Sequence, residues 1–491
     1  MHCPKSGSER QRPITSRIIA QRCWVVVLLA VLLCFVPTCN AQTKYPDTPA
    51  GNQAKGLLDA FNLGNGAKYK EFLSKNYPDR LQNADQDMNF REMTGGFELK
   101  QIEESAPTKI VALVQERSSD QLARLTIEVK ADSPHQITRF DLNAISRPAN
   151  LALPHLSEAA LITAIRTKLD EDVGAGRFSG AVLLAKNGQP VFSQAYGLAD
   201  RDKKISNQLK TRFRIGSMNK MFTAVATLQL VQNGKLDLKT PFGKYLTDYP
   251  NQDVASKVTI EQLLTHTGGT GDIFGPEFAR RRLELKTLQD YVSLYGKRDV
   301  EFEPGSRWRY SNYGFLLLGV LIEKVSGQSY YDYVRDHIFK PAGMTGTGSE
   351  PEDQAVTDRS VGYTRFSGNG LQPNTDTLPY RGTSAGGGYS TVEDLFRFAS
   401  ALQTRKLLNA QYTDLLTTGK VDTGRGKYAF GFQDEVINGT RCFGHGGGAP
   451  GMNGALQICP GPGYVIVVLA NMDPPSASRV ADFVTNRLPA K

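Results

Sequence analysis

The sequence predicts an α/β protein: a large domain with an antiparallel sheet, flanking helices and an all-helical lobe follows a small α+β domain. Three observations lead to this fold class. Two helical patterns and then four alternating segments fill residues 52–145, strand patterns occur at 180–197 and again at 428–471, and the stretch between these is mostly helical. A sheet built from both ends of the large domain, with the helices inserted between, is the economical arrangement.

We place a signal peptide at 1–41, the small α+β accessory domain at 52–146 and the large domain at 157–490, with a linker between the two domains. The small domain resembles, in its order of elements, the cone-shaped domains of the nuclear-transport-factor-two-like group. Substrate binding, dimerisation and a purely positioning role are all open for it. The large domain begins with a helix at about 157–174 and a hairpin that turns at Asn187–Gly188.

The first 41 residues read as a secretory signal peptide. A basic segment ends at Arg22, an apolar run fills 23–36, and small residues precede an expected cut after Ala41. The apolar run is short for a membrane span, so we expect no stable span after cleavage and a periplasmic or secreted protein. An uncleaved anchor is the alternative.

The charge of the chain indicates no nucleic-acid partner. The formal net charge is +9, of which residues 1–41 supply +4 through five Lys and Arg residues and one Glu. The remaining +5 is spread over 450 residues without a basic block, so binding to nucleic acid is not expected. The sequence carries no indication of oligomeric state.

Two cysteines remain after the signal, because four of the six lie within it. Cys442 and Cys459 flank a glycine-rich turn on two strand-like segments. If these strands pair about Pro450–Gly451, the two side chains face each other. A disulfide and a pair of buried free thiols are then the two alternatives.

Ser217 and Lys220 form a Ser-x-x-Lys pair at the start of a helical pattern. Apolar residues recur at helical spacing over 217–233, and Gly234 supplies a stop. In the first turn, free N–H groups and the helix dipole would favour an oxyanion at Ser217. A desolvated Lys220 on the same side could lose its proton and act as a base. The alternative is an ordinary solvated helix start.

Tyr310 and Asn312 form a second motif, Tyr-x-Asn, directly before a strongly apolar helix. A phenol placed there can shuttle a proton to a leaving group, and an amide can hold a substrate carbonyl. The alternative is that Tyr310 packs and Asn312 caps the helix, a role open to Ser311 as well.

His445 ends a strand and is followed by three glycines. Glycine allows a ligand to approach the backbone closely, and the N–H of Gly448 could serve as an oxyanion donor. A structural histidine is the alternative.

The three motifs, in this order, resemble those of serine β-lactamases and penicillin-binding proteins. The likeness is to the branch with class C β-lactamases, D-alanyl-D-alanine carboxypeptidases, D-aminopeptidases and related esterases. It covers about residues 160–490, and three intervening phrases agree: LLTHTGG at 263–269, F-x-P-G-x-x-W-x-Y-S-N at 302–312 and GGGYSTVEDLFRF at 386–398.

The resemblance implies a role for each motif residue. These are Ser217 as acylated nucleophile, Lys220 as its base, Tyr310 as proton relay, Asn312, His445 and Gly447 as substrate-binding residues, and the N–H groups of Ser217 and Gly448 as oxyanion hole. Many members carry Lys where this chain has His445. A histidine is only partly charged near neutrality and suits a substrate carboxylate less well, which disfavours a β-lactamase and leaves carboxypeptidase, aminopeptidase and esterase activities open.

The expected function is that of an exported serine hydrolase acting through an acyl-enzyme on an ester or amide. A D-amino-acid peptide, including one derived from the cell wall, and a small ester are the candidate substrates. The alternatives are a true β-lactamase and a catalytically silent penicillin-binding or sensing protein. No metal site is expected, because the histidines are isolated, and no motif indicates a cofactor.

Ser384 is a rival nucleophile, because GTSAG at 382–386 matches the Gly-x-Ser-x-Gly elbow. That elbow needs a strand before it and a helix directly after it. Here Pro379 precedes, more glycine follows, and the next helix is expected only from Ser390, capped toward Glu393. We therefore predict that Ser384 lies in a loop.

Overall fold

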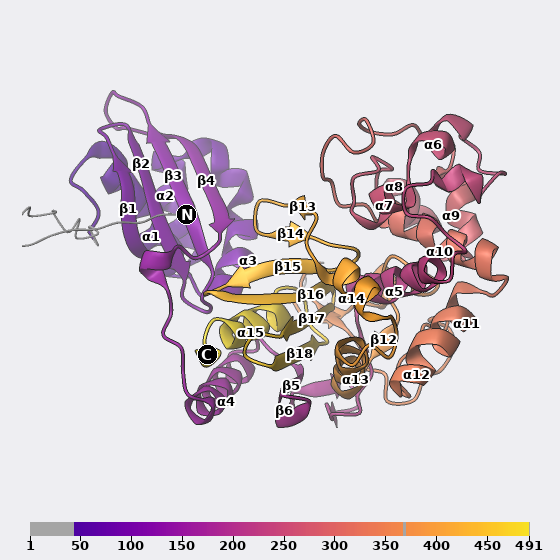
Figure 1. Ribbon diagram of the computed structural model, residues 1–491. Helices are drawn as coiled ribbons and strands as arrows, with labels where there is room; N and C mark the ends of the chain where they lie inside the picture. The colour runs from indigo at the N-terminus through magenta and orange to yellow at the C-terminus, as the bar shows by residue number, and fades with distance from the viewer. Residues whose placement is uncertain (1–43, 367–369, 491) are drawn as a thin grey trace, which may run out of the picture. The chain divides into compact units, whose positions relative to one another are not determined.

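The computed structural model describes residues 44–366 and 370–490 (Figure 1). The expected signal peptide and its cut after Ala41 lie outside these residues. None of the helices in the described ranges combines the length and the hydropathy needed to cross a bilayer.

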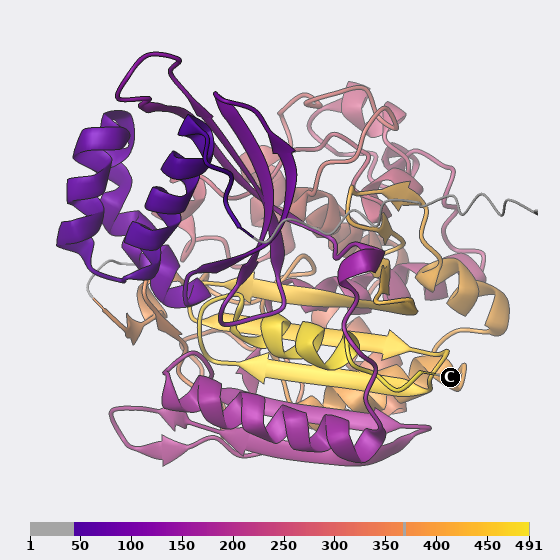
Figure 2. The same cartoon turned by 90° about the vertical axis from the view of Figure 1, so that its left-hand side faces the viewer.

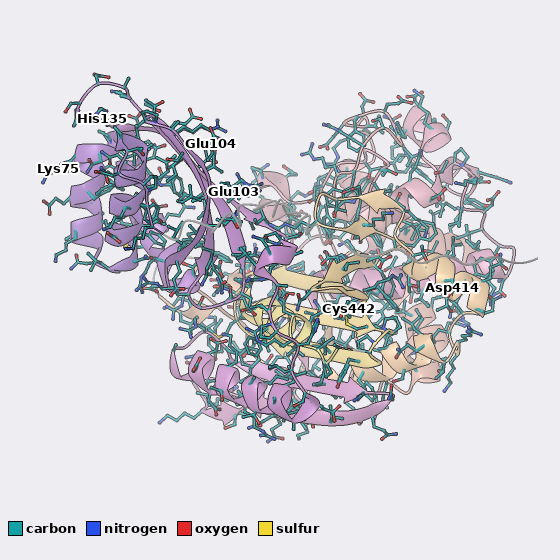
Figure 3. The ribbon with its side chains drawn as sticks, turned by 60° about the vertical axis from the view of Figure 1, so that its left-hand side comes forward. Lys75, Glu103, Glu104, His135, Asp414 and Cys442 are labelled. Atoms are coloured by element: carbon teal, nitrogen blue, oxygen red, sulfur yellow. A yellow bond between two sulfur atoms is a disulfide. The ribbon has the colours of Figure 1, made fainter. Side chains whose placement is uncertain are left out.

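The N-terminal elements are three helices followed by an antiparallel sheet in the order β1-β2-β3-β4. They have their own hydrophobic core, to which α1 contributes Leu57 and Phe61 and β3 contributes Leu125 and Ile127. At the surface, Glu103 of β1 (labelled in Figure 3) forms an ion pair with Arg124 of β3, across the intervening strand β2. The bounds are α1 Pro49–Asn62, α2 Gly66–Asn76, α3 Ala84–Thr94, β1 Phe97–Ser105, β2 Lys109–Glu116, β3 Leu122–Val129 and β4 Ile137–Ile145.

Helix α3 is not predicted from the sequence, and the composition of this helix explains why. Its buried residues are Ala84, Asp87 and Thr94 rather than an apolar stripe. Asp87 tolerates burial because Arg80 donates to both of its carboxylate oxygens, at 2.7 and 2.8 Å, and Tyr69 donates to it as well. A helix held by a buried ion pair leaves no apolar periodicity in the sequence.

The large sheet joins the two ends of the domain, as predicted. Its order is β13-β14-β15-β16-β17-β18-β5-β6, and β18 pairs antiparallel with β5. The first hairpin turns at Asn187 and Gly188, both with positive φ, as a two-residue turn requires. The strands are β5 Gly180–Lys186, β6 Gln189–Tyr196, β13 Val421–Asp422, β14 Lys427–Tyr428, β15 Gln433–Ile437, β16 Thr440–Ala449, β17 Met452–Cys459 and β18 Tyr464–Ala470.

Both faces of this sheet are covered, because alternate residues of its strands point to opposite sides. On β18, Val465 and Val467 belong to the larger core, whereas Ile466 and Val468 belong to a second core shared with α4 and α15. Figure 2 shows α4 (Glu158–Gly174) and α15 (Ser476–Thr485) lying over that second face. Strand β18 is therefore apolar along its whole length, as the uninterrupted run at 464–470 shows.

The predicted helical lobe lies between β9 (Phe213–Arg214) and β12 (Tyr389–Ser390) in the sequence, with α13 and α14 after it. Helix α5 contacts α10 and is buried along almost its whole length. The bounds are α5 Asn219–Gln232, α6 Gln252–Lys257, α7 Ile260–Leu264, α8 Pro276–Arg281, α9 Leu288–Tyr295, α10 Asn312–Ser326, α11 Tyr330–Val334, α12 Lys340–Ala342, α13 Val392–Gln403 and α14 Ala410–Thr417.

Two helix starts differ from expectation. Ser217 lies in a short 3₁₀ turn, Gly216–Met218, directly before α5 rather than in its first turn. Helix α13 begins at Val392, and its cap is Thr391, whose hydroxyl accepts from the N–H of Asp394 at 3.1 Å. Ser390 instead belongs to a short strand, since Thr391 satisfies the free N–H groups one residue later.

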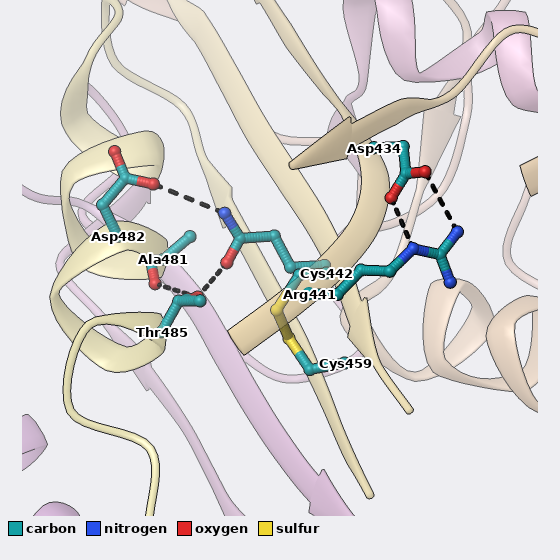
Figure 4. The surroundings of a disulfide bond; sticks show 8 residues. Asp434, Arg441, Cys442, Cys459, Ala481, Asp482 and Thr485 are labelled. Carbon is teal, nitrogen blue, oxygen red and sulfur yellow. Dashed lines mark hydrogen bonds and ion pairs between the residues drawn. A yellow bond between two sulfur atoms is a disulfide. The ribbon is translucent and has the colours of Figure 1, made fainter. Parts of the chain in front are cut away.

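Strands β16 and β17 turn at Pro450–Gly451, with Ala449 opposite Met452. The structure joins Cys442 to Cys459 by a disulfide, with the two Cα atoms 4.2 Å apart (Figure 4). Beside it, Arg441 of β16 forms an ion pair of 2.7 Å with Asp434 of β15. The two ends of the glycine-rich hairpin are thus tied together covalently.

Removing this disulfide is expected to destabilise the protein without changing its fold. The bond closes a loop with a sequence separation of 17. A loop of that size typically contributes about 3 kcal/mol to the free energy of unfolding. The double variant Cys442→Ala, Cys459→Ala should therefore show a lower Tm in calorimetry, and a reductant should lower the Tm of the wild type alone. Equal Tm values for both proteins would contradict the expectation.

Candidate active site

Ser217 and Lys220 lie together at the start of α5. The Lys220 Nζ is 3.3 Å from the Ser217 Oγ, and Ser217 is partly exposed. Lys220 is fully buried, with 0% of its surface exposed. The alternative of a solvated helix start is therefore wrong for Lys220.

The amine of Lys220 faces three oxygen atoms. Besides Ser217, these are the Asn312 Oδ1 at 2.7 Å and the backbone carbonyl oxygen of Ala385. The latter two can only accept, whereas the Ser217 hydroxyl can also donate. A neutral amine can give its two N–H groups to these acceptors, which leaves its lone pair for the Ser217 hydroxyl.

Burial makes this neutral form accessible. Desolvation lowers the pKa of Lys220 to about 7, and the negative charge of Asp272 partly opposes the shift. Near neutral pH, a substantial fraction of Lys220 is therefore deprotonated and able to accept the proton of Ser217.

Tyr310 contacts the same serine. Its phenol shares a hydrogen bond with Ser217, and its ring centroid lies 4.7 Å from the Lys220 Nζ. Burial raises the pKa of Tyr310 well above its ordinary value, while the hydrogen bond to Ser217 lowers it. Tyr310 is therefore a neutral hydroxyl that can donate and accept a proton beside Ser217.

Asn312 is fixed in orientation by its neighbours. A carboxylate can only accept, so the amide nitrogen of Asn312 must face Asp272, to which it donates at 3.0 Å, and the amide oxygen then faces the Lys220 amine. Ser311, not Asn312, caps α10, because its Oγ accepts from the N–H of Gly314 at 2.9 Å. The Asn312 amide thus links the buried lysine to an acidic side chain.

His445 is buried and uncharged at neutral pH. Its Nδ1 lies 2.5 Å from the Gly446 carbonyl oxygen, which can only accept, so Nδ1 carries the proton. Its Nε2 then accepts from the Tyr428 hydroxyl at 3.0 Å. Burial, together with the charge of Lys220, lowers the pKa of His445 to about 3. The sequence predicts only a partial charge on His445 near neutral pH, whereas the buried side chain carries none there.

Glycines bring β16 against the turn that carries Ser217. A Cβ on Gly447 would lie 1.9 Å from the Ile215 carbonyl oxygen, so only glycine fits there. A Cβ on Gly216 would lie 3.0 Å from the backbone nitrogen of Gly448. The backbone of Gly448 therefore lies next to the turn that carries Ser217.

Ser384 is not placed as a nucleophile. Its side chain is fully buried and packs against Gly319 of α10, where a Cβ would lie 2.2 Å from the Ser384 Oγ. Among the residues that the structure describes, that hydroxyl has no hydrogen-bond partner. The neighbouring residue, Ala385, contacts Lys220 through its carbonyl oxygen, a contribution that side-chain motifs cannot indicate.

His266 supports Tyr310 and was not singled out from the sequence. Its Nδ1 accepts from the N–H of Ser311 at 3.1 Å, and its ring centroid lies 4.3 Å from that of Tyr310. Burial lowers the pKa of His266 well below its ordinary value. Its place within LLTHTGG is the signal that could have identified it. Neither Tyr428 nor Asp272 could be identified in this way. Tyr428 belongs to the two-residue strand β14, and Asp272 lies in the loop between α7 and α8.

The described residues show no metal-binding arrangement. Within 44–366 and 370–490, no three His, Cys, Asp or Glu side chains gather closely enough to hold a metal ion. His266 and His445 instead use their ring nitrogens on backbone groups and on Tyr428.

The mixed fold and the Ser–Lys–Tyr cluster are those of the serine hydrolases built on the β-lactamase fold. The model of the Beta-lactamase family matches residues 165–491, and the chain belongs to that family.

Three relatives illustrate the range of this family. A Bacillus subtilis protein named as a penicillin-binding protein, PbpX, is 32% identical over 60% of this chain and 70% of its own length. The structure of a penicillin-binding protein from Bacillus halodurans matches with a TM-score of 0.59, at 34% identity over 65% of this chain and 98% of that chain. A D-stereospecific amidohydrolase from Streptomyces matches with a TM-score of 0.56, at 28% identity over 67% and 98%. The chain spans about two thirds of the length of the curated relatives it matches.

Proposed function

We propose that the protein is an exported serine hydrolase that forms an acyl-enzyme at Ser217 on amide or ester substrates. One observation carries the proposal: the buried amine of Lys220 has two pure acceptors and the hydroxyl of Ser217 around it, with a pKa lowered to about 7. This is the arrangement that a lysine base needs to activate a serine.

The reaction would proceed in two steps. Ser217 Oγ attacks the substrate carbonyl while Lys220 accepts its proton, and the N–H groups of Ser217 and Gly448 stabilise the oxyanion. Tyr310 passes a proton to the leaving amine or alcohol and regains one from Lys220. Water then attacks the acyl carbon while Lys220 and Tyr310 take its proton, and they return a proton to Ser217 Oγ as the acid leaves.

Replacing Tyr310 by Phe tests the relay. The variant keeps the ring against His266 but loses the hydroxyl beside Ser217. Acylation by an amide, whose leaving group must be protonated, should slow by about 10²- to 10³-fold. An ester with a p-nitrophenolate leaving group needs no proton and should be affected less. Equal losses for both substrates in stopped-flow assays would exclude the relay role.

The decisive experiment labels the wild-type protein with a fluorophosphonate and with a fluorescent penicillin, followed by peptide mapping. Covalent mass on the peptide that contains Ser217 supports the proposal, and failure to label under conditions that label a related enzyme contradicts it. Turnover of p-nitrophenyl esters, a cephalosporin and D-Ala-D-Ala peptides then separates the activities. Fast cephalosporin turnover would indicate a true β-lactamase, and labelling without any turnover a silent penicillin-binding protein.

Relatives and the cysteines support the remaining parts of the proposal. The Streptomyces relative is named a D-stereospecific amidohydrolase, and others are named penicillin-binding proteins, which favours a peptide-like or small amide substrate. A disulfide between Cys442 and Cys459 suits an oxidising compartment, as export requires. We assign residues 52–146 to an accessory domain because they have a separate hydrophobic core and supply most of the residues that line a cavity of about 880 Å³.

A further inference from the structure

The N-terminal elements α1 to β4 supply most of the residues that line a cavity of about 880 Å³. Loops of the large domain complete its wall with residues such as Phe366 and Asp473. Neither Ser217 nor Lys220 is among the described residues that line it. Cavities of this size are typical of sites for small molecules. This one is separate from the cluster around Ser217 and is large enough to hold a ligand of its own.

The wall of the cavity is mainly apolar and rich in aromatic rings. Phe61, Phe90 and Phe97 all line it, and their ring centroids lie 5.9 to 6.3 Å from one another. Two of the lining rings are accessible to solvent, since Phe90 is 36% and Phe366 is 62% exposed. An apolar ligand that covers this surface would be stabilised by the hydrophobic effect.

One buried polar group is set into this wall. Asp87 lines the cavity and accepts hydrogen bonds from Tyr69 at 2.9 Å and from Nε and Nη2 of Arg80 at 2.8 and 2.7 Å. The charges of Asp87 and Arg80 therefore cancel. Nη1 of Arg80 donates to no oxygen atom within residues 44–366 and 370–490, and the guanidinium lies 4.5 Å from the ring centroid of Phe140. Arg80 thus keeps two N–H donors beside an apolar ring that also lines the cavity.

The remaining charged groups of the wall favour an uncharged ligand. Asp141 is paired with Arg139 at 2.6 Å, and Asp473 accepts hydrogen bonds from two backbone N–H groups. Glu92 and Arg365, which form no ion pair within the described part of the chain, are exposed and opposite in charge. An anionic ligand would meet the carboxylates, and a cationic ligand would find most of them already bound.

We propose that this cavity binds an uncharged, mostly apolar small molecule that contains a ring system and a carbonyl oxygen. The ring system packs against the aromatic wall, and the carbonyl oxygen accepts a hydrogen bond from Nη1 of Arg80. That bond is favourable because its donor belongs to a charged group in apolar surroundings. The site lies apart from Ser217, so the inference is independent of the proposed hydrolase activity.

The test uses prodan, an uncharged naphthalene with a propionyl group, whose emission shifts to the blue in apolar surroundings. Titration of prodan with the whole protein should give a saturable blue shift with one site per chain. The analogue 2-(dimethylamino)naphthalene, which lacks the carbonyl group, should bind about fivefold more weakly in competition with prodan. The anionic dye 8-anilinonaphthalene-1-sulfonate should also bind more weakly than prodan, because its charge meets a wall that carries carboxylates.

Two variants block the cavity, and a third is their matched control. Phe90→Glu should weaken prodan binding by about tenfold or more, because it replaces part of the apolar wall by a charge. Asn89→Trp, at an exposed lining position, should also weaken binding and does not disturb the ring cluster. Leu63→Glu changes a residue of the same domain that is 63% exposed and does not line the cavity. Its affinity for prodan should stay within about twofold of the wild type.

Arg80→Lys tests the hydrogen bond to the carbonyl oxygen. Lysine keeps a positive charge beside Asp87 but lacks the Nη1 group. The affinity for prodan should fall by about fivefold, whereas the carbonyl-free analogue should bind as it does to the wild type. Equal losses for the two compounds would remove the carbonyl oxygen from the ligand class.

Four results would overturn the proposal. These are the absence of a saturable blue shift with the folded wild type, tighter binding of the sulfonate dye than of prodan, equal losses in Leu63→Glu and Phe90→Glu, and loss of prodan binding once Ser217 has reacted with a fluorophosphonate. The last result would assign the dye to the cluster around Ser217. Failure of the wild type to react with a fluorophosphonate contradicts only the proposed function, since the variants report on the cavity without that reaction.

Discussion

Ser217→Ala is expected to lower kcat/KM for every substrate by about 10⁴- to 10⁶-fold, because it removes the atom that the proposed mechanism acylates. The change deletes one partly exposed hydroxyl and leaves the turn before α5 intact, so the Tm should stay within about 2 °C of the wild type. Intact-protein mass spectrometry after fluorophosphonate treatment should show no adduct.

Ser384→Ala is the matched control for this result. Ser384 is the rival serine in a Gly-x-Ser-x-Gly sequence, but its hydroxyl is buried against Gly319. The variant should retain labelling and turnover. Adduct formation that persists in Ser217→Ala and disappears in Ser384→Ala would transfer the nucleophile to Ser384.

Lys220→Met is expected to be nearly as damaging, with a loss of about 10⁴-fold in acylation rate. Methionine has a similar length and suits a fully buried position, but it lacks the lone pair to which we assign the proton of Ser217. Single-turnover labelling measures the effect without interference from deacylation. A loss below about tenfold would show that another group acts as the base.

The pH dependence of acylation follows from the same lysine. The active form is the neutral amine, so the wild-type rate should rise with pH through about 7 and then level off. The Lys220→Met variant should lack this step. A wild-type rate that falls between pH 6 and pH 8 would contradict a neutral lysine base.

Stability should change with pH in the same direction. The pKa of Lys220 is about 7 in the folded state and near its ordinary value in the unfolded state, so the unfolded chain binds more protons between these values. The free energy of unfolding of the wild type should therefore rise relative to Lys220→Met, by roughly 1.4 kcal/mol per pH unit above about pH 7.5. Urea titrations at pH 7 and pH 9 measure this difference.

The fold class could be predicted because the patterns that indicate its helices, strands and turns each lie within a short stretch of sequence. The apolar run at 464–470 and the Asn187–Gly188 turn each indicate an element from a few neighbouring residues, and both elements are where the sequence places them. Helix α3 could not be predicted, because a buried ion pair between Asp87 and Arg80 replaces the apolar face that produces a helical pattern in a sequence.

The cluster around Ser217 could be predicted only in part, because some of its contacts come from backbone atoms and from burial. Ser217, Lys220, Tyr310 and Asn312 carry their chemistry in ordered motifs, and the structure brings them together. The carbonyl of Ala385 contributes a backbone atom, which leaves no trace in side-chain identity. Likewise, the charge state of His445 depends on burial and on the Tyr428 hydroxyl, which only the packed structure defines.

The pairing of β5 with β18 has a consequence for how the chain is made. A ribosome completes the β5–β6 hairpin before the helical lobe, but the strand β18 that hydrogen-bonds to β5 is synthesised only after that lobe. Until then β5 has an unpaired edge and two uncovered apolar faces, both features that promote aggregation. Contacts this distant in sequence also slow folding. The large sheet therefore cannot close until β18 has been synthesised, whereas the strands β1–β4 have all of their pairing partners within residues 97–145.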